Sequence, residues 1–379
     1  MVGAPGAPHT GPMATTAGSP SLDQLVEATP ERRERLVDLT RVAAIAVVVL
    51  WHWVFSVTQW QGGRLVMPNL ISHVPGLWLG TWVLQIMPAF FIVGGYANLA
   101  SWQRVRRVGG GPAVFWRARL RRLLRPAAVL LAVWALADAV LVLVAGARAD
   151  VLGWGMVTFV PLWFLAVYSA VVVAVPVTAR LHERFGLGVP AVLLVAMALA
   201  GPGYLTTALV WLFAHQLGYF WRDGTVTGQG RRRERRIAAA LVVAGAASLA
   251  LLTTVGGFPR SMVATAGEQG SNMFPTSVCI AALALLQFGL LLAARPALER
   301  WLARRRVWRA VVAANGVAMT VFCWHMTAVV AVIGVSGWLG VHLAHEPTLA
   351  WWAGRPFWLA APAVALGVLV ALFSRVERS

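Results

Sequence analysis

The stretch WRARLRRLLRPAAVLLAVWALADAVLVLVAGA, residues 116–147, decides how this chain folds. Its first ten residues include five arginines, and the 22 residues that follow hold a single charged side chain, Asp138. About 20 consecutive apolar residues are enough to cross a bilayer as a helix. Arginine-rich connections between such spans stay on the cytoplasmic side. The stretch therefore predicts a transmembrane helix that is entered from the cytoplasm.

The rest of the chain has the same character. Its 379 residues are 59% hydrophobic and 12% charged, whereas an ordinary soluble domain is about 25% charged. The 32 basic residues are all arginine and give a net charge of +18. In a soluble protein this excess would suggest nucleic acid, but between apolar spans it is first a topology signal. We expect a membrane protein that does not bind nucleic acid.

We predict an all-α, polytopic bundle of about ten transmembrane helices. They fall near residues 38–58, 78–102, 126–147, 156–178, 187–203, 204–221, 237–257, 276–294, 310–334 and 356–374. The segment GPG at 201–203 could be an external turn or a kink in one re-entrant element. With ten spans and a cytoplasmic N terminus, 27 arginines lie on the inner side. Both termini are then cytoplasmic.

The two ends of this arrangement differ in composition. Residues 1–36 are rich in Gly, Pro, Ala, Ser and Thr and lack the apolar core of a signal peptide, so we expect a disordered cytoplasmic tail. Residues 37–375 form the predicted membrane domain. Cys279 and Cys323 lie inside apolar runs without metal or redox spacing. We expect no metal and no permanently bound cofactor.

Ionisable residues inside spans are costly and are functional candidates by default. Arg41 and His52 are eleven residues apart, which on a helix is three turns plus roughly 20° and a rise of about 16 Å. Both project from one face, with Arg41 near the cytoplasm and His52 past the midplane. Arg41 could hold an anion and a neutral His52 could act as a general base. Alternatively, Arg41 snorkels and His52 only bonds a neighbouring helix.

Other candidates lie at comparable positions in later segments. His325 lies about as deep as His52 and could face the same cavity or simply bond another helix. His215 lies nearer the cytoplasmic end and could line a donor tunnel. Arg119 and Arg122 share a helical face at i, i+3 and could clamp a phosphorylated donor, although the pair Arg121 and Arg125 is an open alternative. As a purely structural segment, the same run anchors the helix and attracts anionic lipid headgroups.

Five sequence elements, in order, resemble the acyltransferase 3 family of integral membrane acyltransferases. The segment RVAAIAVVVLWH (41–52) matches the Arg-ten-residues-His signature of the family. PAFFIVGGY (88–96) is similar to its Phe-Phe-x-x-Ser-Gly-Tyr stretch, and RARLRRLLRP (117–126) to its Arg-x-x-Arg entry to the third span. PLWFLAVY (161–168) resembles its Leu-Trp-Phe-Leu element, and VFCWHM (321–326) its late histidine-bearing helix. Gly94 stands where the family commonly has Ser, so that hydroxyl is absent or replaced by Tyr96 or Asn98.

The resemblance implies transfer of a short acyl group from cytoplasmic acyl-CoA, as co-substrate, to a hydroxyl of a sugar, glycolipid, polysaccharide or macrolide-type acceptor. In this interpretation Arg41, Arg119 and Arg122 hold the donor and His52 is the general base, or transiently carries the acyl group. Tyr96, Trp163, His215 and His325 are candidate cavity-lining residues.

Two other functions fit the same residues. A transporter or flippase for an amphipathic or lipid-linked molecule would use the histidines for proton coupling, and a noncatalytic scaffold would use the arginines to grip anionic lipid. The absence of Lys, with abundant Ala, Arg and Gly, is typical of a GC-rich bacterial genome. We therefore place the protein in a bacterial cytoplasmic membrane, and no oligomeric state is predicted.

Overall fold

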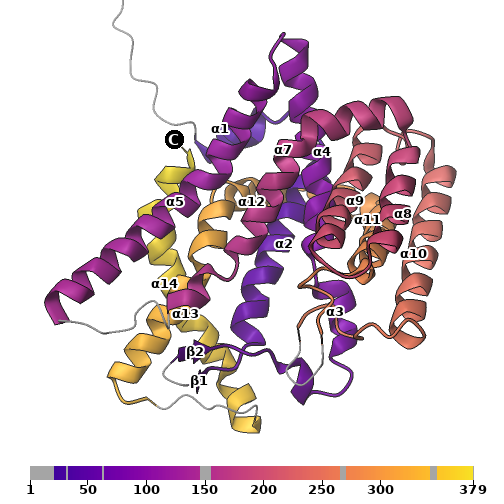
Figure 1. The fold of residues 1–379 in the computed structure, drawn as a ribbon. Helices are drawn as coiled ribbons and strands as arrows, with labels where there is room; N and C mark the ends of the chain where they lie inside the picture. The colour runs from indigo at the N-terminus through magenta and orange to yellow at the C-terminus, as the bar shows by residue number, and fades with distance from the viewer. Residues whose placement is uncertain are drawn as a thin grey trace, which may run out of the picture.

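The computed structural model describes residues 21–30, 33–61, 64–145, 155–264, 270–341 and 348–378 (Figure 1). The prediction of an all-α bundle is confirmed. Its α-helices are α1 (Leu22–Glu27), α2 (Arg35–Val54), α3 (Trp78–Leu84), α4 (Met87–Arg107), α5 (Pro112–Ala145), α7 (Leu162–Phe185), α8 (Gly188–Ala200), α9 (Tyr204–Arg222), α10 (Arg231–Thr254), α11 (Val278–Leu302), α12 (Arg305–Asn315), α13 (Ala318–Trp338) and α14 (Leu349–Arg378). Strands β1 (Gln59–Gln61) and β2 (Arg64–Val66) form a short antiparallel pair, and η1 (Leu70–His73) and η2 (Met156–Phe159) are single 3₁₀ turns.

Eight helical segments among the described residues are long and apolar enough to cross a membrane. They correspond to eight of the ten predicted spans. The other two predicted spans are α8 and α9. Helix α8 has 13 residues and is about 20 Å long, less than the roughly 30 Å hydrocarbon core. The total of ten therefore stays a prediction.

The GPG segment at 201–203 forms a turn. Helix α8 ends at Ala200, α9 begins at Tyr204, and the two helices pack against each other. Gly201 has φ +65°, a left-handed conformation that glycine adopts without steric cost. Residues 188–222 therefore form two helices joined by a turn, and not one kinked re-entrant element.

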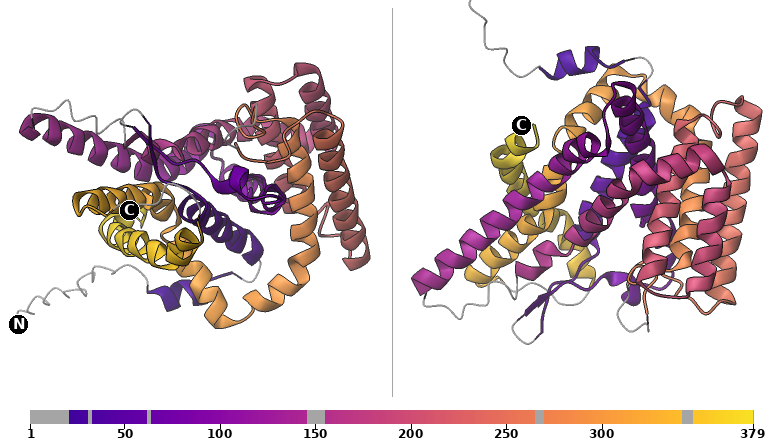
Figure 2. Two further views of the ribbon diagram at one scale, coloured as in Figure 1. Left: turned by 90° about the horizontal axis from the view of Figure 1, so that it is seen from below. Right: turned by 45° about the horizontal axis from the view of Figure 1, so that its top comes forward.

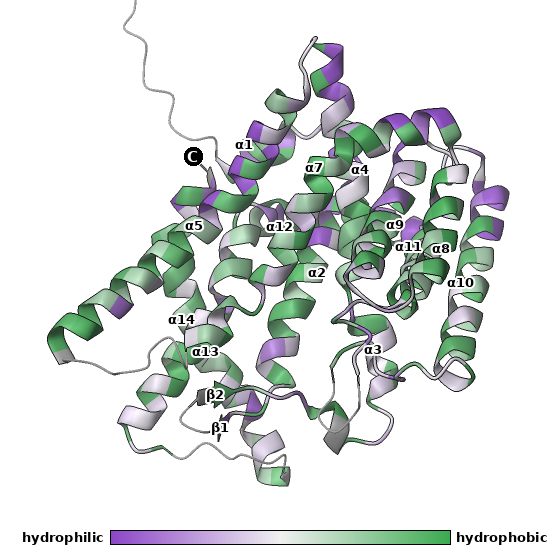
Figure 3. Ribbon diagram, in the orientation of Figure 1, coloured by the Kyte–Doolittle hydropathy of each residue, from purple (hydrophilic) through white to green (hydrophobic). Residues whose placement is uncertain are grey.

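Hydrophilic residues gather at one end of the bundle, where α4 ends and α5 and α10 begin (Figure 3). The C terminus lies at the same end (Figure 1). The basic segment before the third span is not a separate connection, because α5 runs without a break from Pro112 through Pro126 to Ala145. Proline removes one helical hydrogen bond but does not end this helix. We call this part of the bundle the arginine-rich end.

Close helix packing at glycines positions the polar groups of the interior. A Cβ on Gly95 of α4 would meet the carbonyl oxygen of His215 on α9, and one on Gly218 would meet the carbonyl oxygen of Ile92. Small residues let membrane helices approach in this way. Helices α2, α7 and α11 pack against this pair and α8 packs against α9 (Figure 2), whereas the apolar faces of α5 and α14 are largely uncovered. The uncovered faces are the ones available to lipid.

Part of the segment expected to be a disordered tail is helical. Residues 1–20 lie outside the described residues, but Ser21 and Gln24 form a capping box at the start of α1. Helix α1 packs on α12, where Arg305 lies 3.0 Å from a carboxylate oxygen of Glu27 and Trp308 Nε1 donates to Thr29 Oγ1 at 3.1 Å. The composition of residues 1–36 did not reveal this partner, because the basic face of α12 lies nearly 300 residues later.

Candidate active site

The two deepest histidines are in contact. His325 Nε2 on α13 lies 3.2 Å from His52 Nδ1 on α2, and the ring centroids are 5.2 Å apart. The neighbouring Trp53 donates from its indole nitrogen to the carbonyl of His325 at 3.1 Å. Helix α2 is therefore fixed to α13 by two polar contacts at this depth.

The hydrogen bonds assign the tautomers of two neutral rings. His325 Nδ1 lies 2.7 Å from the carbonyl oxygen of Phe322, and a carbonyl can only accept, so this nitrogen carries the proton. His325 Nε2 is then an acceptor and His52 Nδ1 is the donor. This leaves His52 Nε2 with an unshared lone pair. The arrangement is that of a general base oriented by a second residue.

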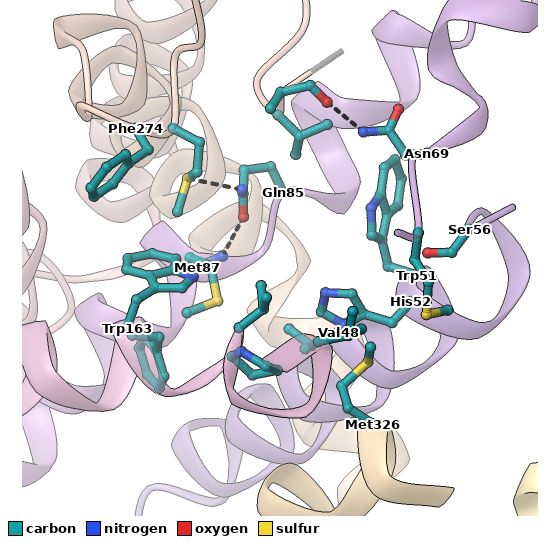
Figure 4. A pocket seen from close by; sticks show the side chains of 18 of the residues that line it. Val48, Trp51, His52, Ser56, Asn69, Gln85, Met87, Trp163, Phe274 and Met326 are labelled. Atoms are coloured by element: carbon teal, nitrogen blue, oxygen red, sulfur yellow. Dashed lines mark hydrogen bonds between the residues drawn. The ribbon is translucent and has the colours of Figure 1, made fainter. Parts of the chain in front are cut away.

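His52 projects into a cavity of about 620 Å³ at the end of the bundle opposite the arginine-rich end (Figure 4). The size is in the ordinary range for a small-molecule site. Among the described residues its walls come from α2, α3, α4, η2, α7 and α13, from the segments that include Ser56 and Asn69, and from residues 263–264 and 271–274. Trp163, a sequence-predicted candidate, lines it, as do Trp51, Met87 and Met326. We call it the His52 pocket.

Most polar side chains of the described pocket wall are already paired. The Gln85 amide donates to Met273 Sδ at 3.1 Å and accepts from the Met87 N–H at 3.3 Å. Asn69 donates to the carbonyl of Ala264 and accepts from the backbone of residue 71. Ser271 Oγ accepts from the N–H groups of residues 273 and 274. These bonds stabilise the wall and leave a ligand only one N–H of each amide and the hydroxyl proton of Ser271.

Arg41 lies on the same face of α2 as His52, because α2 is one continuous helix over Arg35–Val54. Its guanidinium is 3.6 Å from Asp38 Oδ1, and its side chain keeps 26% of its surface exposed. The stronger partner of Asp38 is Arg33, whose Nε lies 2.6 Å from Oδ2. Arg41 therefore keeps much of its charge available at the arginine-rich end.

Arg119 joins Arg41 in one positive region. It is close enough to both Arg41 and Arg122 for mutual repulsion, and Arg122 is exposed. The structure thus brings the three predicted donor-binding arginines together from α2 and α5. Positive charges held close together without equal negative charge favour an anionic ligand.

A buried amide holds Arg119 in place. Asn98 on α4 has no exposed surface, and its Oδ1 accepts from two nitrogens of Arg119, with the Nε contact at 2.9 Å. Its Nδ2 lies 3.2 Å from Tyr168 Oη and 3.0 Å from His215 Nε2. His215 thus belongs to this polar network, the Asn98 network, and not to the described wall of the His52 pocket.

Tyr168 explains the glycine at position 94. A Cβ on Gly94 would lie 2.6 Å from Tyr168 Oη and 2.7 Å from its Cε2. The phenol of α7 therefore fills the space that a serine side chain would need. Sequence reasoning considered Tyr96 and Asn98 as replacements for the family's serine and missed Tyr168, although Tyr168 ends the quoted element PLWFLAVY.

Tyr96 lies elsewhere. Its ring packs 5.5 Å from that of Trp221, and Arg222 approaches its hydroxyl at 3.4 Å. It does not line the described His52 pocket. Arg222 also lines a separate open cleft of about 490 Å³, with Gln103, Arg106 and Arg107. Only Arg106 of this group has an acidic partner among the described residues, Glu183 at 2.8 Å.

A narrow apolar gap lies between the arginine group and the His52 pocket. It begins one turn beyond Arg41, at Ala44 and Ile45, and shares Val48 with the pocket wall. Its remaining lining residues are Met87, Phe90, Phe164, Met319 and Phe322. Only about 10 Å³ is open, room for about one water molecule. We call it the apolar passage.

No group of three or more His, Cys, Asp or Glu side chains able to hold a metal ion occurs within the described ranges. Cys279 and Cys323 are both buried and free, one on α11 and one on α13. The site is therefore described by its imidazole pair, its guanidinium group and the apolar passage between them.

A polytopic helical bundle with a pair of imidazoles in contact and a ligand-sized pocket beside them fits an integral membrane enzyme. The chain belongs to the acyltransferase 3 family, whose model, described as an acyltransferase domain, matches residues 35–376. It is thus a multi-pass membrane O-acyltransferase. No curated protein and no solved structure matches it significantly.

Proposed function

We propose that the protein transfers a short acyl group from acyl-CoA to a hydroxyl of a sugar, glycolipid, polysaccharide or macrolide-type acceptor, with His52 as general base. The observation that supports this proposal is the position of His52, which lines a ligand-sized pocket one helical turn beyond Val48, a residue that the pocket shares with the apolar passage, and which keeps its Nε2 free. The acyl donor reaches it from one side and the acceptor from the other.

In the proposed reaction His52 Nε2 removes the proton of the acceptor hydroxyl as its oxygen attacks the thioester carbonyl. The carbon–sulfur bond breaks, and the His52 imidazolium returns the proton to the leaving thiolate of CoA. His325 acts as a positioning residue, because its Nε2 accepts the Nδ1 proton of His52 and fixes the ring orientation. A positioned general base typically contributes about 10²–10⁴-fold in rate.

Arg41, Arg119 and Arg122 hold the phosphates of the donor in this proposal. Charge-assisted hydrogen bonds from guanidinium groups suit phosphate oxygens, and Arg41 lies eleven residues, or about 16 Å, from His52 along α2. The flexible pantetheine arm then enters along the apolar passage, whose side chains have to move apart to admit it because only about 10 Å³ is open. We also propose that the membrane is a bacterial cytoplasmic membrane, with both chain termini and the arginine-rich end inside.

The test is acyl-CoA turnover by the purified protein in lipid nanodiscs. His52→Ala should keep its fold and lose about 10²-fold or more in acyl transfer. His325→Gln, which offers an amide oxygen to His52 Nδ1, should retain more activity than His325→Phe. Wild-type turnover by His52→Ala would refute the mechanism. Counterflow in sealed vesicles without acyl-CoA, in place of acyl transfer, would support the transporter alternative.

A further inference from the structure

The wall of the His52 pocket is unusual for a site that receives a sugar polymer. Among the described residues that line it, none is charged, and the Asn69 and Gln85 amides already bond other protein atoms. A ligand is left the His52 ring nitrogen, the hydroxyl protons of Ser56 and Ser271, two indole N–H groups and the second N–H of each amide, a small polar set for a cavity of about 620 Å³. A soluble oligosaccharide would lose most of its hydrogen bonds to water on entering such a pocket, without an equal return.

The apolar part of the wall suits a different ligand. Four methionines line it, at positions 67, 87, 273 and 326. Methionine is unbranched and polarisable and adapts to irregular apolar shapes. A cavity of about 620 Å³ is also far larger than a short acyl group requires, so most of its volume is left for the acceptor.

The position of the pocket separates acceptor from donor. It lies at the end of the bundle opposite the arginine-rich end, and Ser56 and Phe274 are part of its wall (Figure 4). The apolar passage on its other side is nearly closed. A bulky acceptor therefore enters from the end opposite to the donor.

From these observations we infer that the acceptor is an amphipathic molecule with a bulky apolar body that carries its reactive hydroxyl, and not a water-soluble polysaccharide. The apolar body fills the His52 pocket and the hydroxyl meets His52 Nε2. The inference rests on the proposed function, since it assigns the acceptor class of the same site.

A homologous series of acceptors tests this inference. Methyl, butyl and heptyl glucoside carry the same sugar hydroxyls and differ only in the apolar group. Each is supplied below its micelle-forming concentration to the protein in nanodiscs with acetyl-CoA, and maltotriose is the soluble comparison. Burial of one methylene is worth about a fourfold gain in affinity, so kcat/KM should rise at least about tenfold from methyl to heptyl glucoside.

Matched variants separate the pocket from the membrane. The variant Val157→Thr/Val160→Thr adds two hydroxyl groups to the pocket wall. It should lose most of the rise in kcat/KM from methyl to heptyl glucoside. The control Val173→Thr/Val177→Thr changes two exposed valines of α7 outside the described pocket wall. This control should retain the rise in kcat/KM from methyl to heptyl glucoside. A gain that survives equally in both variants would reflect partition into the bilayer and would overturn the inference.

Three other results of these experiments bear on the acceptor class. Equal use of the three glucosides, or preference for maltotriose, would overturn the inference. The inference would also be overturned if activity depended on the acyl-chain length of the donor and the Val157→Thr/Val160→Thr variant abolished that dependence. The pocket would then hold the acyl group of the donor and not the acceptor. Binding is measured separately as the rise in Tm of His52→Ala with each glucoside. A chain-length-dependent rise in Tm, together with no acyl transfer by the wild-type protein, would sustain the pocket assignment and refute the proposed reaction instead.

Discussion

Replacing Asn98 by leucine tests whether the Asn98 network holds Arg119 for the donor. The two side chains have the same number of heavy atoms and the same branching at Cγ, so Asn98→Leu removes hydrogen bonds without leaving a cavity. It deprives Arg119 of its acceptor and leaves Tyr168 and His215 without the shared amide. Because Asn98 has no exposed surface, water does not readily replace it.

The magnitude follows from these contacts. A hydrogen bond to a charged group is worth about 1.5–3 kcal/mol, and a neutral interhelical bond in a membrane protein about 0.6 kcal/mol. Loss of the Arg119 contact and two neutral contacts should therefore destabilise the protein by about 3–4 kcal/mol. Asn98→Asp is the matched control, since its carboxylate still accepts from Arg119 and His215 can change tautomer to donate.

The assay is equilibrium unfolding in mixed micelles, combined with the KM for acyl-CoA. Asn98→Leu should unfold at lower denaturant and show a raised KM, whereas Asn98→Asp should be close to wild type in stability. The Asp variant should also bind the donor more weakly, because a carboxylate beside Arg119 competes with phosphate. If Asn98→Leu is as stable as the wild type, the assignment of the network is wrong.

Three further predictions concern other parts of the site. Gly94→Ser should destabilise the protein by about 1–3 kcal/mol in the same unfolding assay, since its Cβ displaces Tyr168; unchanged stability would show that the ring moves freely. Arg41→Ala should raise the KM for acyl-CoA about tenfold or more through loss of a charge-assisted contact, whereas Arg306→Ala, exposed on α12, should not; equal effects would indicate nonspecific attraction. Burial raises the pKa of Glu34, before α2, from its ordinary 4.5, because desolvation outweighs the attraction of Arg295. Its stabilising contribution is therefore complete below pH 4.5 and is lost as pH rises through the raised pKa. Tm measured from pH 4 to 7 should fall less in Glu34→Gln than in wild type, and parallel profiles would contradict this assignment.

Helix content and the shared face of Arg41 and His52 could be predicted from the sequence because both depend on local periodicity. A run of apolar residues specifies a spanning helix, and eleven residues of one helix bring two side chains to one face. The start of α5 was not predicted, because proline usually begins or breaks a helix and the predicted span therefore begins at Pro126. In the structure the helix continues through Pro126.

The partners of the buried polar groups could not be predicted in the same way. Contact between His52 and His325 joins residues 273 positions apart, and only their similar depth suggested it. His215 was expected near a donor tunnel, but the close approach of α4 and α9 at Gly95 and Gly218 brings it to Asn98. Such contacts depend on which helices are neighbours, and the pattern of a single span does not carry that information.

The narrowness of the apolar passage has a consequence for the membrane that surrounds it. A continuous file of water between the two ends of the bundle would conduct protons and other ions. Three phenylalanines and two methionines leave space for about one water molecule, and apolar constrictions of this kind resist wetting. In the proposed reaction, an acyl group would thus pass from one face of the bilayer to the other without a water-filled, ion-conducting path between them.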